Sequence, residues 1–375
     1  PIRAAPAAMQ SRRGPARQAE RNECSRRMSI LDDTITSPAH VAARLPALCR
    51  RALGGSGEIR GLARLTGGAT KATWRLEASA ADGWRALILQ QCVDPARAPD
   101  DPKSAMPRVV GDEDAAVMLA AAAAGVPVPP LRATLTPQDG LGGGYLVDLV
   151  PGEASGRRIV AAPDFAEVRP RLAAQYGEIV GRIQQVDIAD PALAFLQPFG
   201  PRETLACYRA VYDYYDHPHP AIALGLKWAE AHLPPPQPPV LVHGDYRNGN
   251  LMVDPGGVTA VLDWELAHTG DPMEDLGWLC VNSWRYGGDG PVGGFGARED
   301  LFAGYERTAG RPADPEAVRF WEVFGHVRWA IMCMMKGESH ASRHGGERTM
   351  EAFAIGRRTE EPLFDLIRDL TGQAA

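Results

Sequence analysis

The 375-residue sequence lacks any hydrophobic run long enough to cross a membrane as a helix. Such a helix needs about 20 consecutive apolar residues, and the most hydrophobic stretches, residues 115–124 and 329–335, reach roughly half that length. We therefore expect no membrane partner. With 45% hydrophobic and 23% charged residues, the composition is that of a soluble globular protein with a sizeable core.

Cysteine is scarce, and no two cysteines form a Cys-x-x-Cys pair. This spacing excludes the usual zinc sites and disulfide frameworks. We interpret all of the cysteines as reduced packing residues, which is typical of a cytoplasmic protein. They are Cys24, Cys49, Cys92, Cys207, Cys280 and Cys333.

The chain also lacks an excess of positive charge, since its formal net charge is −6. Binding to nucleic-acid phosphates depends on a basic surface, so we expect no nucleic-acid partner. Residues 1–27 are the exception, because they are rich in arginine and show no apolar periodicity. We predict that they form a disordered tail that precedes the folded chain.

Alternating apolar residues predict an antiparallel β-meander in the first half of the chain. Strands are expected at residues 59–66, 73–78 and 84–91, with a tight turn at Asp82-Gly83. A helix is expected from Asp112 to Ala124, because Gly125 and two nearby prolines form a strong stop signal. Two more strands fit residues 131–135 and 145–150, joined by a glycine-rich loop.

The second half is mainly helical, with amphipathic stretches near residues 167–186, 203–232, 315–336 and 349–370. Pro151-Gly152 separates the two halves. We therefore predict a two-lobed α+β molecule. Residues 28–150 would form an N-lobe with an antiparallel sheet and one main helix, and residues 151–375 a mainly helical C-lobe that carries a β-hairpin.

That hairpin contains the most informative segment, residues 240–263. His243-Gly244-Asp245 follows a short apolar strand, and Asn250 comes five residues after the aspartate. A strand, a glycine-rich turn and a second strand then end in Asp263. This order places Asp245, Asn250 and Asp263 at one end of the hairpin, which is the outline of a magnesium-phosphate site.

The residue types suit phosphoryl transfer, in which catalysis is mostly positioning and neutralisation of phosphate charge. Carboxylate and amide oxygens are ligands that Mg²⁺ accepts, which fits Asn250 and Asp263. A carboxylate without a metal to bind, Asp245, is free to take the proton of a hydroxyl group. The Asp-x-x-x-x-Asn spacing is that of the protein-kinase catalytic loop.

Three segments together carry a family resemblance: HGDYRNGN at residues 243–250, VLDWE at 261–265 and HTGDPMEDLGWL at 268–279. They resemble the aminoglycoside phosphotransferase and choline kinase group, whose domains also occur fused to acyl-CoA dehydrogenases. The resemblance implies a bilobal protein-kinase-like fold that uses ATP and Mg²⁺. It extends from the LTGGATKATW turn at residues 65–74 to the GRR segment at 356–358.

The resemblance also assigns roles within the site. Gly67, Gly68 and Thr70 would cover the phosphates, and the backbone of Asp148, Leu149 and Val150 would face adenine. For His243 the residues themselves leave two alternatives, a general base or a side chain that orients the loop through hydrogen bonds, and we favour the second. Arg247 and Glu265 are candidate contacts for the acceptor.

The following segment has a local interpretation as well. Asp271 would cap a helix that begins at Pro272, and Glu274 stands where a capping-box acid belongs. Asp275 either braces the catalytic loop from that helix or is simply solvated.

One position departs from the family. Active relatives carry Lys or Arg on the third strand, paired with an acid on the next helix, and here that position is Gln90. The helix acid is Asp114, with Glu113 as an alternative, so the ion pair would lack its cation. Lys71 or Arg75 on the preceding strand is another source of charge. The alternative is that Gln90 points into the lobe and a neighbouring residue faces the phosphates.

Two functions from different classes follow. The first is an ATP- and Mg-dependent kinase that phosphorylates a hydroxyl group of a small molecule. The second is a nucleotide-binding pseudokinase with a regulatory role, favoured by Gln90 and opposed by the intact Asp245, Asn250 and Asp263. A protein kinase is disfavoured because no activation segment separates Asp263 from the next helix. The acceptor stays open between an aminoglycoside, a hydroxyacyl-CoA, a sugar and an amino alcohol.

Overall fold

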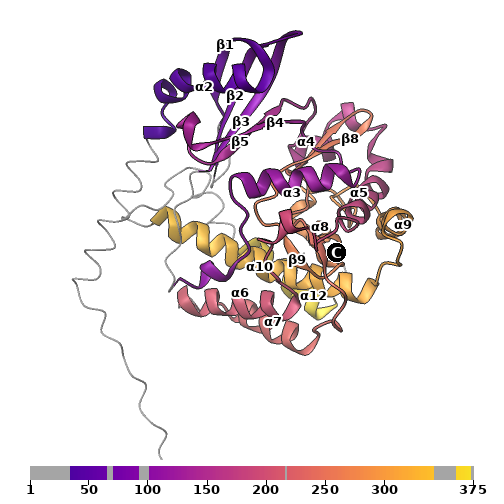
Figure 1. Ribbon diagram of the computed structural model, residues 1–375. Coiled ribbons are helices and arrows are strands. Elements are labelled where there is room, and N and C mark those ends of the chain that lie inside the picture. The colour runs from indigo at the N-terminus through magenta and orange to yellow at the C-terminus, as the bar shows by residue number, and fades with distance from the viewer. Residues whose placement is uncertain (1–33, 66–70, 93–100, 216–217, 342–359, 373–375) are drawn as a thin grey trace, which may run out of the picture.

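A computed structural model describes residues 34–65, 71–92, 101–215, 218–341 and 360–372. Within these residues a sheet-bearing part, drawn in indigo and violet, adjoins a larger helical part (Figure 1). The predicted α+β bilobal, protein-kinase-like fold is confirmed. The predicted tail, residues 1–27, lies outside the described residues.

The sheet of the first part has, within the described residues, the antiparallel strand order β1-β2-β3-β5-β4. β2 and β3 pair from Lys71↔Cys92 to Ala80↔Gly83, so the predicted hairpin at Asp82-Gly83 is confirmed. The strands are β1 (Gly54–Arg64), β2 (Lys71–Ala80), β3 (Gly83–Cys92), β4 (Leu131–Thr134) and β5 (Gly144–Asp148).

A helix that the sequence analysis missed packs against this sheet. α2 (Pro38–Leu53) places Leu45 and Leu48 in one buried cluster with Trp74 and Leu89 of the sheet. Its signals are local: Ser37 accepts from the N–H of His40, and Gly54 ends the helix with a φ of 67°. The N-lobe therefore has two main helices rather than the single one predicted.

The second of these helices, α3 (Asp112–Ala123), lies between the sheet and the helical part (Figure 1). Its predicted bounds are confirmed to within a residue. Val117, Met118 and Ala121 belong to the same buried cluster as Tyr176 of the helical part. Side chains from both sides of residue 150 thus share one core, and the division into lobes at that residue stays a prediction.

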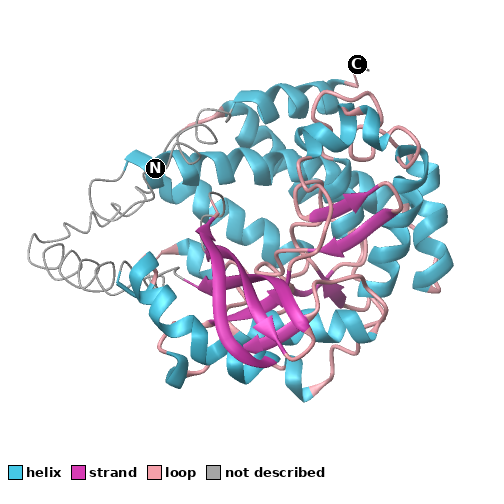
Figure 2. Cartoon of the chain, turned by 90° about the horizontal axis from the view of Figure 1, so that it is seen from above, coloured by secondary structure: helices cyan, strands magenta, loops and turns pink. Residues whose placement is uncertain are grey.

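The helical part contains α4 (Gly156–Ala161), α5 (Arg169–Ile183), α6 (Pro201–Tyr215), α7 (Pro220–Ala231), α8 (Glu274–Cys280), α9 (Arg298–Ala309), α10 (Pro315–Ala341) and α12 (Glu360–Thr371). The stretch predicted as helical at residues 203–232 is two helices, because Pro218 and Pro220 cannot continue the first one. Viewed from above, the sheet lies on one side and the long helices lie on the other (Figure 2). No helix in the described ranges is long and apolar enough to cross a membrane.

Two short antiparallel pairs are set into the helical part. β7 (Leu251–Asp254) and β8 (Gly257–Val261) form the predicted hairpin, with Leu251 opposite Val261. β6 (Val240–Val242) pairs with β9 (His268–Gly270). The segments that leave β6 and β8 therefore lie close together, and they carry Asp245 and Asp263.

Candidate active site

The loop that follows β6 turns sharply at Gly244. This glycine has a φ of 82°, and a Cβ atom added there would lie 2.5 Å from the carbonyl oxygen of Leu266. A side chain at this position would therefore be both strained and blocked. The turn directs Asp245 away from the strand.

Asp275 of α8 braces this turn, as one of the two alternatives predicted. Its Oδ2 accepts the backbone N–H of His243 at 2.8 Å, and its Oδ1 accepts that of Gly244 at 3.0 Å. Burial raises the pKa of Asp275, and these donors partly oppose the rise. The carboxylate thus fixes the first two residues of the loop.

His243 is fully buried, and its two ring nitrogens bond to the backbone. Nε2 lies 3.0 Å from the carbonyl oxygen of Leu262, and Nδ1 accepts the N–H of Asp245 at 3.2 Å. In this tautomer Nε2 donates. The geometry favours an orienting side chain, because neither nitrogen is available to remove a proton from a substrate.

Asp245 receives hydrogen bonds from three side chains. Its Oδ1 accepts from Nε of Arg247 at 2.9 Å and from Nε1 of Trp278 at 2.9 Å. Its Oδ2 accepts from Nδ2 of Asn250 at 2.7 Å. Arg247 also stacks on Trp284, with its guanidinium carbon 4.3 Å from the ring centroid. The carboxylate is therefore held before any substrate binds.

Asn250 and Asp263 lie at the same end of the β7–β8 hairpin, as predicted. The N–H of Leu262 donates to the carbonyl oxygen of Asn250 at 2.8 Å, which ties the two strand ends together. The Nδ2 of Asn250 points to Asp245, so its Oδ1 is the atom left to bind a cation. Asp263 has a φ of 65°, unusual for a non-glycine residue.

This donor set fits Mg²⁺, which usually binds through one or two protein oxygens and completes its shell with phosphates and water. Among the described residues no group of three or more His, Cys, Asp or Glu side chains gathers as a self-sufficient metal site. A site made by one carboxylate, one amide and a nucleotide is consistent with that finding.

The prediction that the ion pair lacks its cation was wrong, and the alternative, a charge from Lys71 on the preceding strand, is what the structure shows. Nζ of Lys71, on β2, lies 2.7 Å from Oδ2 of Asp114 and 2.9 Å from Oδ1 of Asp263. Burial lowers the pKa of Lys71, but Tyr145, Asp263 and Asp114 outweigh it and hold that pKa well above its ordinary value. For Asp263, burial alone would raise the pKa, but the charge and hydrogen bond of Lys71 outweigh burial and hold that pKa below its usual range.

Strand register explains why Lys71 can replace a cation at Gln90. Thr73 pairs with Gln90, and Gln90 pairs with Tyr145 of β5. Because side chains alternate along a strand, Lys71 shares a face with all three. The hydroxyl of Tyr145 donates to Gln90 Oε1 and lies 3.2 Å from Asp114 Oδ2. Gln90 thus borders the site, while the charge comes from the neighbouring strand.

Of the other residues predicted to contact the nucleotide, some lie outside the described ranges and some lie in the sheet. Gly67, Gly68 and Thr70 lie outside the described residues. The backbone N–H groups of Asp148 and Leu149 donate to Pro130 and Ala86, both at 3.0 Å. Of the three residues predicted to face adenine, Val150 is therefore the one whose backbone N–H is not used in such a bond to Pro130 or Ala86.

The two residues predicted to contact the acceptor, Arg247 and Glu265, lie on different sides of the site. Arg247 lies beside Asp245, as described above. Glu265 lies on the Lys71 side, with its Oε2 3.9 Å from Lys71 Nζ, and its carbonyl oxygen accepts the N–H of Val109 at 2.8 Å. Glu265 therefore adjoins the expected phosphates rather than Asp245.

The helix after β9 begins later than predicted. α8 starts at Glu274, and Asp271 instead stabilises the preceding turn by accepting the N–H of Met273 at 2.8 Å. Glu274 is not a capping-box acid, because its carboxylate lies 2.7 Å from Arg328 and 3.2 Å from His268. The ion pairs of Glu274 with Arg328 and His268 replace the predicted capping contact.

Sequence reasoning missed Trp278. The signal is its position three residues after Asp275 on α8, which puts both side chains on the face that meets the catalytic loop.

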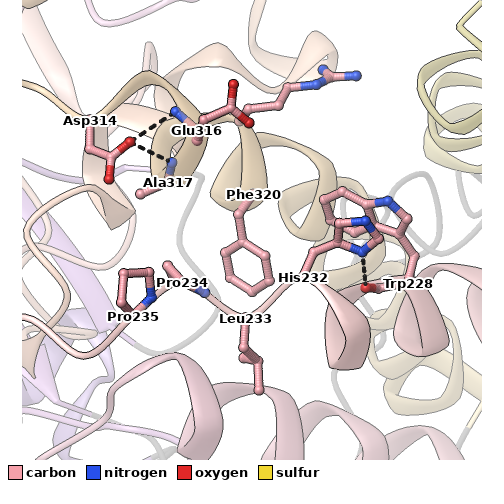
Figure 3. Close-up of a pocket in the computed structure, with 10 residues that line it drawn as sticks. Trp228, His232, Leu233, Pro234, Pro235, Asp314, Glu316, Ala317 and Phe320 are labelled. Carbon is pink, nitrogen blue, oxygen red and sulfur yellow. Dashed lines mark hydrogen bonds between the residues drawn. The ribbon is translucent and has the colours of Figure 1, made fainter.

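A surface pocket of about 240 Å³ lies between α7 and α10 (Figure 3). Trp228, His232 and Phe320 line it, and Asp314 accepts the N–H groups of Glu316 and Ala317 at its edge. No lining residue belongs to the loop 243–250 or bonds to Asp245. The candidate active site is therefore the loop 243–250 with Asp263, and not this pocket.

Comparison with protein families now adds to this geometry. A model of the phosphotransferase enzyme family, APH, matches residues 61–321, which is more than half of the chain. This range contains every predicted site residue.

Two curated proteins are similar over part of the sequence. Acyl-CoA dehydrogenase family member 10 of Mus musculus is 33% identical over 175 residues, which are 44% of this chain and 16% of that protein. Acyl-CoA dehydrogenase family member 11 of Gallus gallus is 38% identical over 81 residues, 20% of this chain and 10% of that protein. The chain thus corresponds to a small part of these relatives.

Solved structures share the fold at low identity. A candidate aminoglycoside phosphotransferase from Ralstonia eutropha JMP134 has a TM-score of 0.64 at 21% identity, covering 86% of this chain and 95% of that one. Macrolide 2'-phosphotransferase MphH from Brachybacterium faecium has a TM-score of 0.53 at 21% identity, covering 86% and 97%. A thermostable mutant of aminoglycoside phosphotransferase APH(4)-Ia, in a ternary complex with AMP-PNP and hygromycin B, has a TM-score of 0.54 at 17% identity, covering 88% and 99%.

Proposed function

Since this chain belongs to the phosphotransferase enzyme family, we propose that it is an ATP- and Mg-dependent kinase that phosphorylates a hydroxyl group of a small molecule. One observation carries the proposal. Asp245 and Asn250 are hydrogen-bonded to each other at 2.7 Å, and Asp263 lies beside them with a cation, Lys71, 2.9 Å away. The candidate base for the hydroxyl group of the acceptor and the candidate residues for the phosphates of the nucleotide thus lie together.

On the acceptor side, Asp245 takes the proton of the attacking hydroxyl group. A carboxylate suffices as the base, because the transition state of phosphoryl transfer is loose and the proton leaves late. Asp275 and His243 keep the loop in the conformation that presents Asp245. Their role is support, since both accept hydrogen bonds from backbone N–H groups of the loop.

On the donor side, Asn250 Oδ1 and Asp263 would hold Mg²⁺, which when bound neutralises phosphate charge. Lys71, kept in place by Asp114 at 2.7 Å, is the protein's own cation for the phosphates. Val150 can offer its N–H to adenine, and Gly67, Gly68 and Thr70 would cover the phosphates. We further propose a cytoplasmic location, because Cys49, Cys92, Cys207, Cys280 and Cys333, the cysteines within the described ranges, are all free thiols.

The pseudokinase alternative loses its support. It rested on a missing cation at Gln90, and Lys71 supplies a cation to Asp114 from the adjacent strand. No described feature of the catalytic loop favours a protein that only binds nucleotide.

The test is phosphoryl transfer from MgATP to a panel of aminoglycosides, hydroxyacyl-CoA thioesters, sugars and amino alcohols. Asp245→Asn should retain MgATP binding by calorimetry but lower kcat by about 10²- to 10⁴-fold, the usual worth of a positioned base. Asp164→Asn, an exposed carboxylate, is the matched control.

Comparable kcat values for Asp245→Asn and the parent, with a phosphorylated product confirmed, would remove Asp245 from the base role. MgATP binding without transfer to any member of the panel would favour the pseudokinase instead.

A further inference from the structure

The two oxygens of the Asp245 carboxylate are not equivalent. Oδ1 already accepts two hydrogen bonds, from Arg247 Nε and Trp278 Nε1, each at 2.9 Å. Among the residues that the structure describes, Oδ2 accepts only the hydrogen bond of Asn250, at 2.7 Å. A carboxylate oxygen has about two lone pairs to offer, so Oδ1 is saturated and Oδ2 keeps one free position.

We propose that Trp278 is a positioning residue, whose indole N–H holds Oδ1 of Asp245 so that Oδ2 receives the acceptor's proton. The inference rests on the proposed function. In the step it concerns, the acceptor oxygen forms a bond to the γ-phosphorus while the bond from phosphorus to the β-phosphate oxygen breaks. The hydroxyl proton moves to Asp245 Oδ2, and ADP leaves with the electron pair of the broken bond.

Trp278 is suited to this task because its own position is fixed. It is 1% exposed and lies on α8 one turn after Asp275, which braces the same loop. The guanidinium of Arg328, from α10, stacks 4.8 Å from its ring centroid. Gly325 of the same helix packs against it, since a Cβ atom there would lie 3.4 Å from Trp278 Cε3.

Arg247 alone would hold Asp245 less well. Its guanidinium also donates to the carbonyl oxygen of Asn248, at 3.0 Å, so it is shared between two acceptors. Arginine can bind a carboxylate through both oxygens, which would occupy Oδ2. A second, rigid donor on Oδ1 opposes that rotation without adding charge. The neutral indole therefore selects the reactive oxygen.

A matched control lies in the same aromatic cluster. Trp329 is 7% exposed, and within the described part of the chain its indole N–H has no hydrogen-bond partner. Replacing Trp329 by Phe removes a similar volume and an N–H that bonds to nothing, whereas replacing Trp278 by Phe removes the bond to Asp245.

The experiment compares Trp278→Phe with Trp329→Phe, using the acceptor identified by the MgATP panel. Trp278→Phe should lower kcat by about 10- to 100-fold, the order expected for a misplaced catalytic group, with the KM values for ATP and acceptor within about twofold. Trp329→Phe should keep kcat within about twofold. If Trp278→Phe fails to fold, 3-benzothienylalanine introduced at position 278 keeps the ring shape and replaces only the N–H.

A second measurement does not depend on turnover. In the ¹⁵N-labelled protein, the indole N–H resonance of Trp278, identified by its loss in Trp278→Phe, should shift in Asp245→Asn, while that of Trp329 should not. An unshifted Trp278 resonance, or a full kcat for the benzothienylalanine protein, overturns the inference. Full activity of Asp245→Asn would instead refute the proposed base, so the two failures are distinguishable.

Discussion

At the scale of single residues, the most consequential contact is the one between Lys71 and two carboxylates. Its Nζ bridges Asp114 and Asp263, which are 43 and 192 residues away in sequence. The lysine is 7% exposed, so both interactions are shielded from solvent. A cation in this position is available to a phosphate group that binds next to Asp263.

Replacing this cation should weaken nucleotide binding. A hydrogen bond to a charged group contributes about 1.5–3 kcal/mol, so Lys71→Met should raise the Kd for MgATP by about 10- to 150-fold in calorimetry. Arg75→Met is the control, because Arg75 is on the same strand face but is exposed.

The register also predicts a rescue. Gln90 borders Tyr145 and Asp114, so Gln90→Lys in the Lys71→Met background should recover part of the lost affinity. An unchanged Kd for Lys71→Met would show that Lys71 does not meet the phosphates. A loss without rescue would mean that the strand position of the cation matters.

At the scale of elements, α3 joins the sheet to the helical part. Its acidic first turn contributes Asp114 to the site, while Val117, Met118 and Ala121 face the large core. The same helix thus positions the partner of Lys71 and joins the two parts. A loss of packing on its inner face should affect the whole fold.

This packing can be measured with two neighbouring residues. Met118 is 3% exposed and Leu119 is 52% exposed. Met118→Ala should lower the free energy of unfolding by about 2–5 kcal/mol, because it leaves a cavity in the core. Leu119→Ala should change it by about 0.5 kcal/mol or less in urea denaturation. Equal effects of the two substitutions would contradict the assignment of the inner face.

At the scale of the whole molecule, a buried charge cluster links β9, α8 and α10 behind the catalytic loop. Glu274 lies 2.7 Å from Arg328 and 3.2 Å from His268, and all three are nearly inaccessible to solvent. His268 also lies 2.8 Å from the carbonyl oxygen of Leu266. Removing one partner from such a cluster leaves the others buried and uncompensated.

The cluster should make stability depend on pH. Burial lowers the pKa of His268, but Glu274 and the carbonyl of Leu266 outweigh it and raise that pKa above its ordinary value; Asp275 acts in the same direction. The folded state therefore holds a proton that the unfolded chain releases. The resulting stabilisation is complete below about pH 6.5 and is lost as the pH rises through the folded-state pKa.

Chemical denaturation of the parent and of His268→Gln measures this effect. The parent should lose more unfolding free energy than the variant as the pH rises from about 6.5. Parallel pH profiles for the two proteins would show that His268 is not charged in the folded state. Glu274 has the opposite tendency: burial raises its pKa, but Arg328 and His268 lower it overall, so its contribution is lost only in acid.

Features that depend on neighbouring residues could be predicted from the sequence. Asp245, Asn250 and Asp263 lie within one short strand-turn-strand segment, so their spacing was enough to predict that they share one end of a hairpin. The α3 bounds followed from local stop signals, and the β2–β3 pairing from one turn. The signals of α2 are equally local, because Ser37 caps its first turn and Gly54 ends it.

The distant side chains that complete the site could be identified only from the folded chain, because strand pairing and helix packing bring them together. Lys71 reaches Asp114 because strand pairing sets it on the face of Gln90 and Tyr145, a register that no single strand encodes. Trp278 reaches Asp245 because α8 packs against the catalytic loop through Asp275. Glu274 does not make the predicted capping contact, because its buried carboxylate pairs with Arg328 and His268 instead. An unpaired charge in a core costs more free energy than a missing helix cap.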